Sequence, residues 1–229
     1  MAMLANKSVI VTGGLGALGR VVVSELAAQG ARVAVLDCSA RPDAGRAEVV
    51  YDGVDLCNAS ATAKAMESIA AQLGGIYGLV NVAGGFRYEP ISEGTLDTWD
   101  LMYETNLRSC AAACLSVLPY LRSNGSGRIV NIGAASAQRA TCGLGAYAAS
   151  KAGVARLTES LSDELKDQSI TVNAVLPSVI DTPANRLQMS GADFTRWVSP
   201  TSVAHLVAFL LSDQSIDITG ALVPIVGRM

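Results

Sequence analysis

Tyr147 and Lys151 are the residues whose types and spacing best suit acid–base chemistry. Side chains four residues apart lie on one face of a helix, so the ammonium group can stand beside the phenol. A free phenol ionises near pH ~10, and a neighbouring cation lowers that pKa because it favours the phenolate. The pair therefore indicates a tyrosine that works as a general acid or base, although surface helices also produce this spacing by chance.

A glycine-rich segment stands between an apolar run and an amphipathic stretch near the start of the chain, Thr12-Gly-Gly-Leu-Gly-Ala-Leu-Gly19. Glycines let the backbone approach a pyrophosphate, whose charge is met by the N-terminus of the following helix. The residues that we predict to bind a dinucleotide here are Gly13, Leu15, Gly16, Leu18 and Gly19.

Further candidate contacts follow the next predicted strands, where ligands bind in open parallel sheets. Asp37 can accept hydrogen bonds from the adenosine ribose and would repel a 2′-phosphate, which favours NAD (NADH) over NADP. Cys38 follows it rather than a cation, although Arg41 is close in sequence, and Asp37 could instead be a solvated acid. The other predicted contacts are Asp55, Leu56, Asn81, Ala83 and Gly84.

Short apolar runs that alternate with longer helical segments must position these residues. The runs are 8–12, 32–36, 76–80, 128–132, 170–175 and 221–226, and the helical segments lie near 16–29, 59–73, 95–122, 145–167 and 200–212. Continuous apolar strands separated by helices indicate a parallel sheet covered on both faces. We predict a doubly wound α/β Rossmann fold of about seven strands, in a single domain over residues 1–229 because no linker-like segment divides it.

Composition excludes several function classes. Half of the 229 residues are hydrophobic, the net charge is -3, and no basic stretch suggests a nucleic-acid partner. A signal-peptide pattern and a run of 18 apolar residues are both absent, so we expect a cytoplasmic protein. The five cysteines form no CxxC pair and are expected to be reduced thiols, while the single His205 argues against a multi-histidine metal site.

Together, the glycine segment, Asn81-Val-Ala-Gly84, Asn106, the Tyr147/Lys151 pair and 177–182 resemble the short-chain dehydrogenase/reductase family over essentially the whole chain. The resemblance implies hydride transfer between nicotinamide and a carbonyl, hydroxyl or imine-type carbon. It implies Tyr147 as the acid/base, Lys151 holding the ribose and lowering the tyrosine pKa, and Asn106 holding a proton-relay water. It also implies a homodimer or homotetramer through the helices near 95–122 and 145–167.

The same resemblance places a substrate region after the sixth run. The predicted nicotinamide contacts are Pro177, the backbone of Ile180 and the hydroxyl of Thr182, although the segment could be an ordinary turn. A lid is predicted at about 181–198, where Met189, Phe194 and Trp197 offer apolar surface and Asn185 and Arg186 offer polarity. The alternative is that Phe194 and Trp197 anchor the loop, and Phe86 and Tyr88 form a second candidate rim.

Two positions depart from the family pattern. Ala17 replaces a glycine but keeps a small side chain at the helix start. Ala134, thirteen residues before Tyr147, stands where the family has a serine that hydrogen-bonds the reacting oxygen. Losing such a donor typically costs ~10²-fold in rate or more, unless Ser136 bends into the site.

The missing serine and several motifs resemble the quinonoid dihydropteridine reductases, whose conjugated substrates spread the charge that arrives with hydride. These motifs are Gly16-Ala-Leu-Gly19, Val82-Ala-Gly-Gly-Phe86, Ala174-Val-Leu-Pro177 and Ile180-Asp-Thr-Pro-Ala-Asn-Arg186. The sequence thus predicts an NADH-dependent reductase of a carbonyl or quinonoid ring. A dihydropteridine reductase proper and a non-catalytic dinucleotide-sensing protein are the alternatives.

Overall fold

A computed structural model of the chain describes residues 2–40 and 45–228, and Arg41 lies outside them. Seven parallel strands form one sheet in the order β3-β2-β1-β4-β5-β6-β7. Their bounds are β1 (Ser8–Thr12), β2 (Arg32–Leu36), β3 (Val49–Tyr51), β4 (Gly78–Asn81), β5 (Gly127–Ile132), β6 (Ile170–Pro177) and β7 (Leu222–Ile225). The chain winds outward from β1 to β3, crosses to β4 and winds outward again to β7, which confirms the predicted doubly wound fold.

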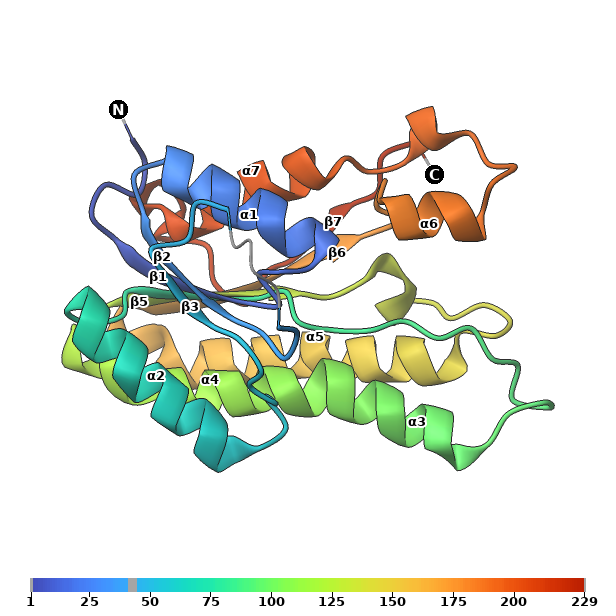
Figure 1. Cartoon of the computed structure of the whole chain (residues 1–229), viewed down its shortest axis with the longest axis horizontal. Helices are drawn as coiled ribbons and strands as arrows, with labels where there is room; N and C mark the ends of the chain where they lie inside the picture. Colours follow the sequence, from blue (N-terminus) through green and yellow to red (C-terminus); the bar gives the residue numbers. More distant parts are fainter. Residues whose placement is uncertain (1, 41–44, 229) are drawn as a thin grey trace.

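Helices cover both faces of the sheet (Figure 1). Their bounds are α1 (Ala17–Ala28), α2 (Ala59–Leu73), α3 (Leu96–Met102), α4 (Ser109–Ser123), α5 (Gly145–Leu165), α6 (Pro183–Gln188) and α7 (Pro200–Leu211). α1 and α7 pack together on one face, and α2, α4 and α5 lie on the other. The strands β1, β5 and β6 are buried along their whole length. They are buried on both sides because each face of the sheet packs against helices in its own apolar core.

One predicted helical segment is not a continuous α-helix. Between α3 and α4 the chain forms a π-helical turn, Tyr103–Arg108, in which the Ser109 N–H donates to the Glu104 carbonyl five residues earlier. Single π-helical turns are rare and are often found at functional sites. Hydrophobic periodicity does not distinguish this turn from an α-helix, and Asn106 lies inside it.

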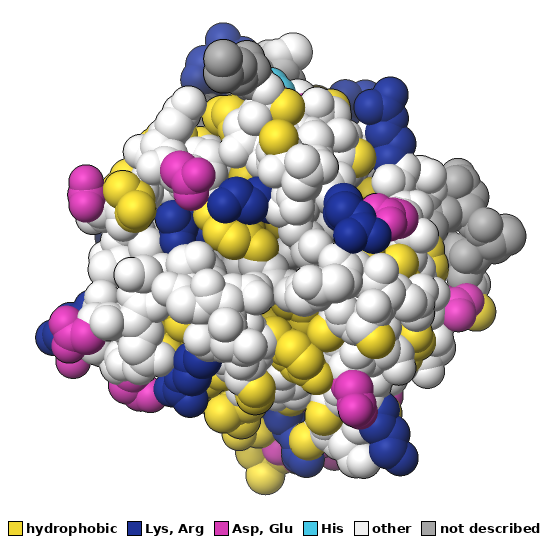
Figure 2. Space-filling model, turned by 90° about the vertical axis from the view of Figure 1, so that its left-hand side faces the viewer, with side chains coloured by type: hydrophobic (Ala, Val, Ile, Leu, Met, Phe, Trp, Pro, Cys, Tyr) yellow, Lys and Arg dark blue, Asp and Glu magenta, His cyan; other side chains and the backbone are white. Residues whose placement is uncertain are grey.

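The carboxyl ends of all seven strands lie at the same edge of the sheet, because the strands are parallel. In Figure 1 this edge is on the right, where the loops after β4 and β5 gather with α6. The opposite edge faces the viewer in Figure 2, where basic and acidic side chains are scattered singly or in pairs over the described surface. Within the described residues, no helix is both long and apolar enough to cross a membrane.

Candidate active site

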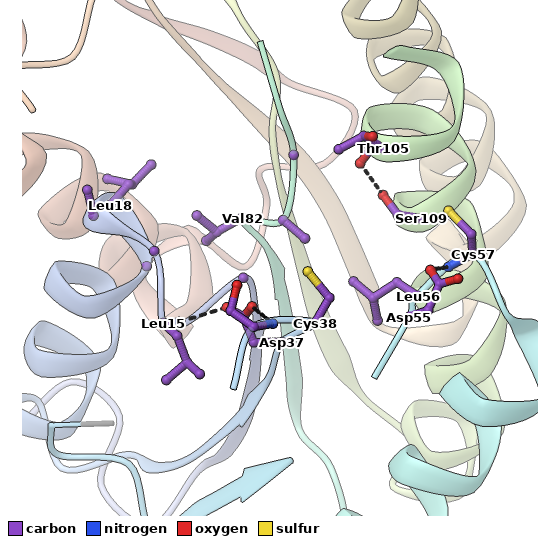
Figure 3. A pocket seen from close by; sticks show the side chains of 17 residues that line it. Leu15, Leu18, Asp37, Cys38, Asp55, Leu56, Cys57, Val82, Thr105 and Ser109 are labelled. Carbon is purple, nitrogen blue, oxygen red and sulfur yellow. Dashed lines mark hydrogen bonds between the residues drawn. The ribbon is translucent and has the colours of Figure 1, made fainter. Parts of the chain in front are cut away.

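A cavity of about 430 Å³ opens at the carboxyl ends of β1, β2 and β4 (Figure 3). The predicted dinucleotide contacts that line it are Gly13, Leu15, Gly16, Leu18, Gly19, Asp37, Asp55, Leu56, Ala83 and Gly84. The other lining residues are Ala17, Cys38, Ser39, Cys57, Val82, Thr105 and Ser109. Cys38, Cys57 and Val82 are sequence neighbours of predicted contacts, whereas Thr105 and Ser109 reach the cavity only because the helical segment packs across it.

The glycine segment has the close packing that its composition predicted. Gly13 has φ +66°, and a Cβ there would lie 2.6 Å from the Ala83 backbone nitrogen. A Cβ on Gly19 would collide with the Gly13 carbonyl oxygen. α1 begins after Gly16 without a side-chain cap, so the first N–H groups of this helix remain available to an anion at the cavity.

Asp37 is buried and fixed at the cavity wall. One carboxylate oxygen accepts a hydrogen bond from Leu15 N at 2.9 Å, and the other accepts one from Ser39 N at 2.9 Å. An ionised carboxylate has about four acceptor positions, so two contacts leave capacity for ribose hydroxyl groups. Among the described residues that line the cavity there is no lysine or arginine.

Asn81 is not among the residues that line the cavity, and its predicted dinucleotide contact stays a prediction. Its side chain accepts a hydrogen bond from Thr12 Oγ1 at 3.3 Å and donates one to Asn131 Oδ1 at 2.9 Å. Asn131 in turn donates to Thr158 Oγ1 at 2.9 Å, which connects the sheet to α5. Asn81 therefore ties β1, β4 and β5 together, because its side chain lies within the layer between the sheet and the helices.

Lys151 lies immediately behind the cavity wall. Its Nζ is buried and donates a hydrogen bond to Ile132 O at 2.8 Å. A Cβ placed on Gly84, which lines the cavity, would lie 3.4 Å from Lys151 Nζ and 2.7 Å from Asn106 Oδ1. The glycine at position 84 thus leaves the end of the cavity open towards the lysine and the asparagine.

Burial shifts the pKa values of both members of the tyrosine–lysine pair. It raises the pKa of Tyr147 to about 12 and lowers the pKa of Lys151 to about 8. Both shifts have the same main cause, because desolvation disfavours the charged form of each group, and the lowering of the tyrosine pKa by Lys151 stays a prediction. Tyr147 is a neutral phenol at pH 7, ready to donate its proton.

The side chain of Asn106 connects three elements around Tyr147. Its Nδ2 donates to Gly85 O at 3.1 Å and to Ser150 Oγ at 3.0 Å, and its Oδ1 accepts from Gly85 N at 2.9 Å. Ser150 Oγ donates to Tyr147 O at 2.7 Å. These bonds use the N–H donors of the amide and one of the two acceptor positions of its oxygen, so this side chain positions the loop after β4 against α5.

The position of the missing serine carries no hydroxyl. Ala134 is buried and precedes a short 3₁₀ turn, Ala135–Ala137. Ser136 lies in this turn, and its Oγ is buried without a hydrogen-bond partner among the described residues. The structure therefore places a methyl group, rather than a hydroxyl donor, at position 134.

The residues of the predicted nicotinamide segment are not among those that line the cavity. Pro177 ends β6, Ile180 O accepts a hydrogen bond from Asn185 Nδ2 at 2.8 Å, and Thr182 Oγ1 accepts one from Asn185 N at 3.3 Å. The Thr182 hydroxyl thus caps α6 as an acceptor and keeps its own O–H as a donor, so its carboxamide contact stays a prediction.

The segment 181–198 is held together by its own side chains. Trp197 is buried, and the Phe194 ring lies on it with a centroid distance of 4.8 Å. The Arg186 guanidinium lies 4.9 Å from the Phe194 centroid and is bound to Asp181, with Nε 2.6 Å from Oδ1. These contacts agree with the anchoring alternative for both aromatic residues, while Met189 stays 38% exposed and free to meet a ligand.

Comparison with known proteins assigns the chain to a family. The family model described as short chain dehydrogenase matches residues 7–192. The chain belongs to this family. Its members use a nicotinamide dinucleotide, and the cavity beside Gly84 and Lys151 lies where the sheet topology places such a ligand. No group of side chains among the described residues is suited to holding a metal ion.

Several relatives of this short-chain dehydrogenase match over nearly their full length. A 4-formylbenzenesulfonate dehydrogenase from Comamonas testosteroni is 32% identical, covering 98% of each chain. A 3-oxoacyl-(acyl-carrier-protein) reductase from Staphylococcus aureus is 30% identical, covering 99% of each chain. A crystal structure of levodione reductase has a TM-score of 0.89 with 27% identity, covering 98% of this chain and 97% of that one. These relatives support an oxidoreductase but differ in substrate.

Proposed function

We propose that this short-chain dehydrogenase is an NADH-preferring reductase of carbonyl or quinonoid ring substrates, with Tyr147 as the proton donor. The observation that carries the proposal is that Lys151 and Asn106 both lie next to Gly84, a residue that lines the cavity. The bound dinucleotide would supply the hydride. Asp37 suits ribose hydroxyl groups, the N-terminus of α1 suits a pyrophosphate, and a cavity of about 430 Å³ lies in the range of ligand pockets.

The roles of the protein's own side chains in the reaction follow from the shifted pKa values of Tyr147 and Lys151. Tyr147, protonated at neutral pH, donates its proton to the substrate oxygen or ring nitrogen as negative charge develops there. After Tyr147 has donated its proton, the positive charge of Lys151 stabilises the phenolate that remains. Because Ala134 provides no hydroxyl, Tyr147 is nearly the sole donor to the reacting atom.

The proposed substrates are therefore activated acceptors, in which conjugation spreads the developing charge. A quinonoid dihydropterin and conjugated cyclic or aromatic ketones meet this requirement. The segment 181–198 is the proposed substrate lid, with its 194–197 part as a fixed base. We also propose a single catalytic domain, a cytoplasmic location, and a homodimer or homotetramer.

The test is steady-state NADH oxidation with isatin, menadione, a quinonoid dihydropterin and cyclohexanone. Tyr147→Phe should lower kcat by ~10²-fold or more while NADH still binds, whereas Tyr103→Phe, at an exposed tyrosine, should leave the rate unchanged. Unchanged turnover in Tyr147→Phe contradicts the tyrosine mechanism. Tight NADH binding without turnover of any carbonyl compound favours the dinucleotide-sensing alternative.

A further inference from the structure

Phe86 makes direct ring contact with the proposed proton donor. The centroids of Phe86 and Tyr147 are 5.0 Å apart, and their planes meet at 78°, which is the edge-to-face arrangement that aromatic pairs prefer. Phe86 nevertheless keeps 50% of its surface exposed. A large apolar ring that packs on Tyr147 and still offers half of its surface to solvent stands beside the place where a substrate must receive its proton.

The backbone that carries Phe86 is fixed on both sides. Both backbone groups of the preceding Gly85 are hydrogen-bonded to Asn106. Two residues after Phe86, the Tyr88 ring packs on Gly143 so closely that a Cβ there would collide with it. Glu89 N donates to Gly143 O at 2.9 Å. The loop after β4 is thus held against both the π-helical turn and the loop before α5, so it presents Phe86 in a defined position.

Two residues of the candidate site contribute little polarity. Ala134 contributes a methyl group, and the side chain of Asn106 is directed to Gly85 and Ser150 rather than outwards. A substrate that takes its proton from Tyr147 would lie beside the apolar ring of Phe86. Such a combination suits a flat conjugated ring, which gains from ring contact and needs little oxyanion stabilisation, better than a flexible aliphatic ketone.

We propose that Phe86 determines substrate specificity, by forming the wall against which the planar ring of the substrate lies while Tyr147 protonates it. This inference rests on the proposed reductase function and adds a selectivity for planar rings to it. Phe86 touches the substrate and the ring of Tyr147, and Gly85 and Asn106 hold it in place.

The test compares kcat/KM for isatin, a planar ring ketone, with kcat/KM for cyclohexanone, a puckered aliphatic one. Phe86→Leu keeps an apolar side chain of similar reach but removes the flat ring. We expect it to lower kcat/KM for isatin by about fivefold, the size of a typical ring-pair contact, and to change the value for cyclohexanone less than twofold. Phe86→Tyr keeps the ring and should retain the wild-type preference.

Three results would overturn the inference. If Phe86→Leu lowers kcat/KM equally for both ketones and shifts the pH profile of the reaction, Phe86 only shields Tyr147 from water. Wild-type selectivity in Phe86→Leu means that the ring does not meet the substrate. In both cases the wild-type protein reduces the ketones, so the proposed reductase function stands. If the wild-type protein oxidises no NADH with either ketone, the proposed function and the inference are both overturned.

Discussion

The ammonium group of Lys151 donates a hydrogen bond to the carbonyl oxygen of Ile132, with 2.8 Å between Nζ and O. Ile132 is the last residue of β5, so the lysine of α5 is held against the carboxyl end of the central sheet. A buried ammonium group with one carbonyl partner is poorly solvated, which explains why its pKa falls to about 8. This contact fixes Lys151 behind Gly84 before any ligand binds.

The first prediction concerns the pH dependence of stability. Burial lowers the pKa of Lys151 from 10.5 in the unfolded chain to about 8 in the folded protein, so between these values the unfolded chain binds more protons. The free energy of unfolding contributed by Lys151 therefore rises with pH across this window, by on the order of 3 kcal/mol in total. Urea denaturation from pH 7 to 10.5 should show this rise in the wild type and its loss in Lys151→Met.

Lys166→Met is the matched control, because Lys166 is exposed and bound to Asp163. It should follow the wild-type pH dependence above pH 8. If the free energy of unfolding changes with pH in the same way in the wild type and in Lys151→Met, the lowered pKa of Lys151 is contradicted. Tyr147 opposes the rise only at the top of this window, because burial raises its pKa from 10.0 to about 12 and its contribution to stability therefore falls as the pH passes about 10.

The second prediction concerns the dinucleotide. Asp37→Ala removes the acceptor of Leu15 N and Ser39 N and the proposed acceptor of the ribose hydroxyls. NADH should bind about tenfold more weakly or worse, and the preference over NADPH should shrink because the repulsive carboxylate is gone. Fluorescence titration with both dinucleotides measures this. Asp217→Ala, at an exposed position, is the control, and an unchanged NADH/NADPH ratio in Asp37→Ala would contradict the assignment.

The third prediction concerns the missing donor. Ala134→Ser places a hydroxyl where the chain has a buried methyl group, and it should raise kcat for cyclohexanone by up to ~10²-fold, with a smaller gain for isatin. Ala135→Ser, one residue further along, should give no gain. If Ala134→Ser is no faster on either ketone, the oxyanion is already stabilised, and Ser136 becomes the first candidate donor.

The fourth prediction separates a structural role from a cofactor contact at Asn81. Asn81→Ala removes buried hydrogen bonds to Thr12 and Asn131, so the free energy of unfolding should fall by on the order of 2 kcal/mol. NADH affinity in the folded variant should stay within about twofold of wild type. A large loss of NADH affinity at unchanged stability would restore Asn81 as a direct contact.

The predicted strands and glycine loop agree with the structure because both depend on short-range patterns. Alternating apolar runs indicated the doubly wound sheet, and the glycine segment lines the cavity as expected. The π-helical turn at Asn106 was not predicted, since a single extra residue in a helical turn leaves the hydrophobic pattern almost unchanged. Thr105 and Ser109 were missed for the same reason, because their place at the cavity depends on how that turn packs.

The sequence by itself determined the family, the order of the elements and the residue types available for acid–base chemistry. These properties depend on local spacing and composition, which the chain carries directly. Tertiary structure alone decided the pKa directions of Tyr147 and Lys151, the placement of Asn81 between strands, and the contact of Phe86 with Tyr147. Burial and contact between distant segments set these properties, and no spacing along the chain reports how deeply a group is desolvated or which ring it meets.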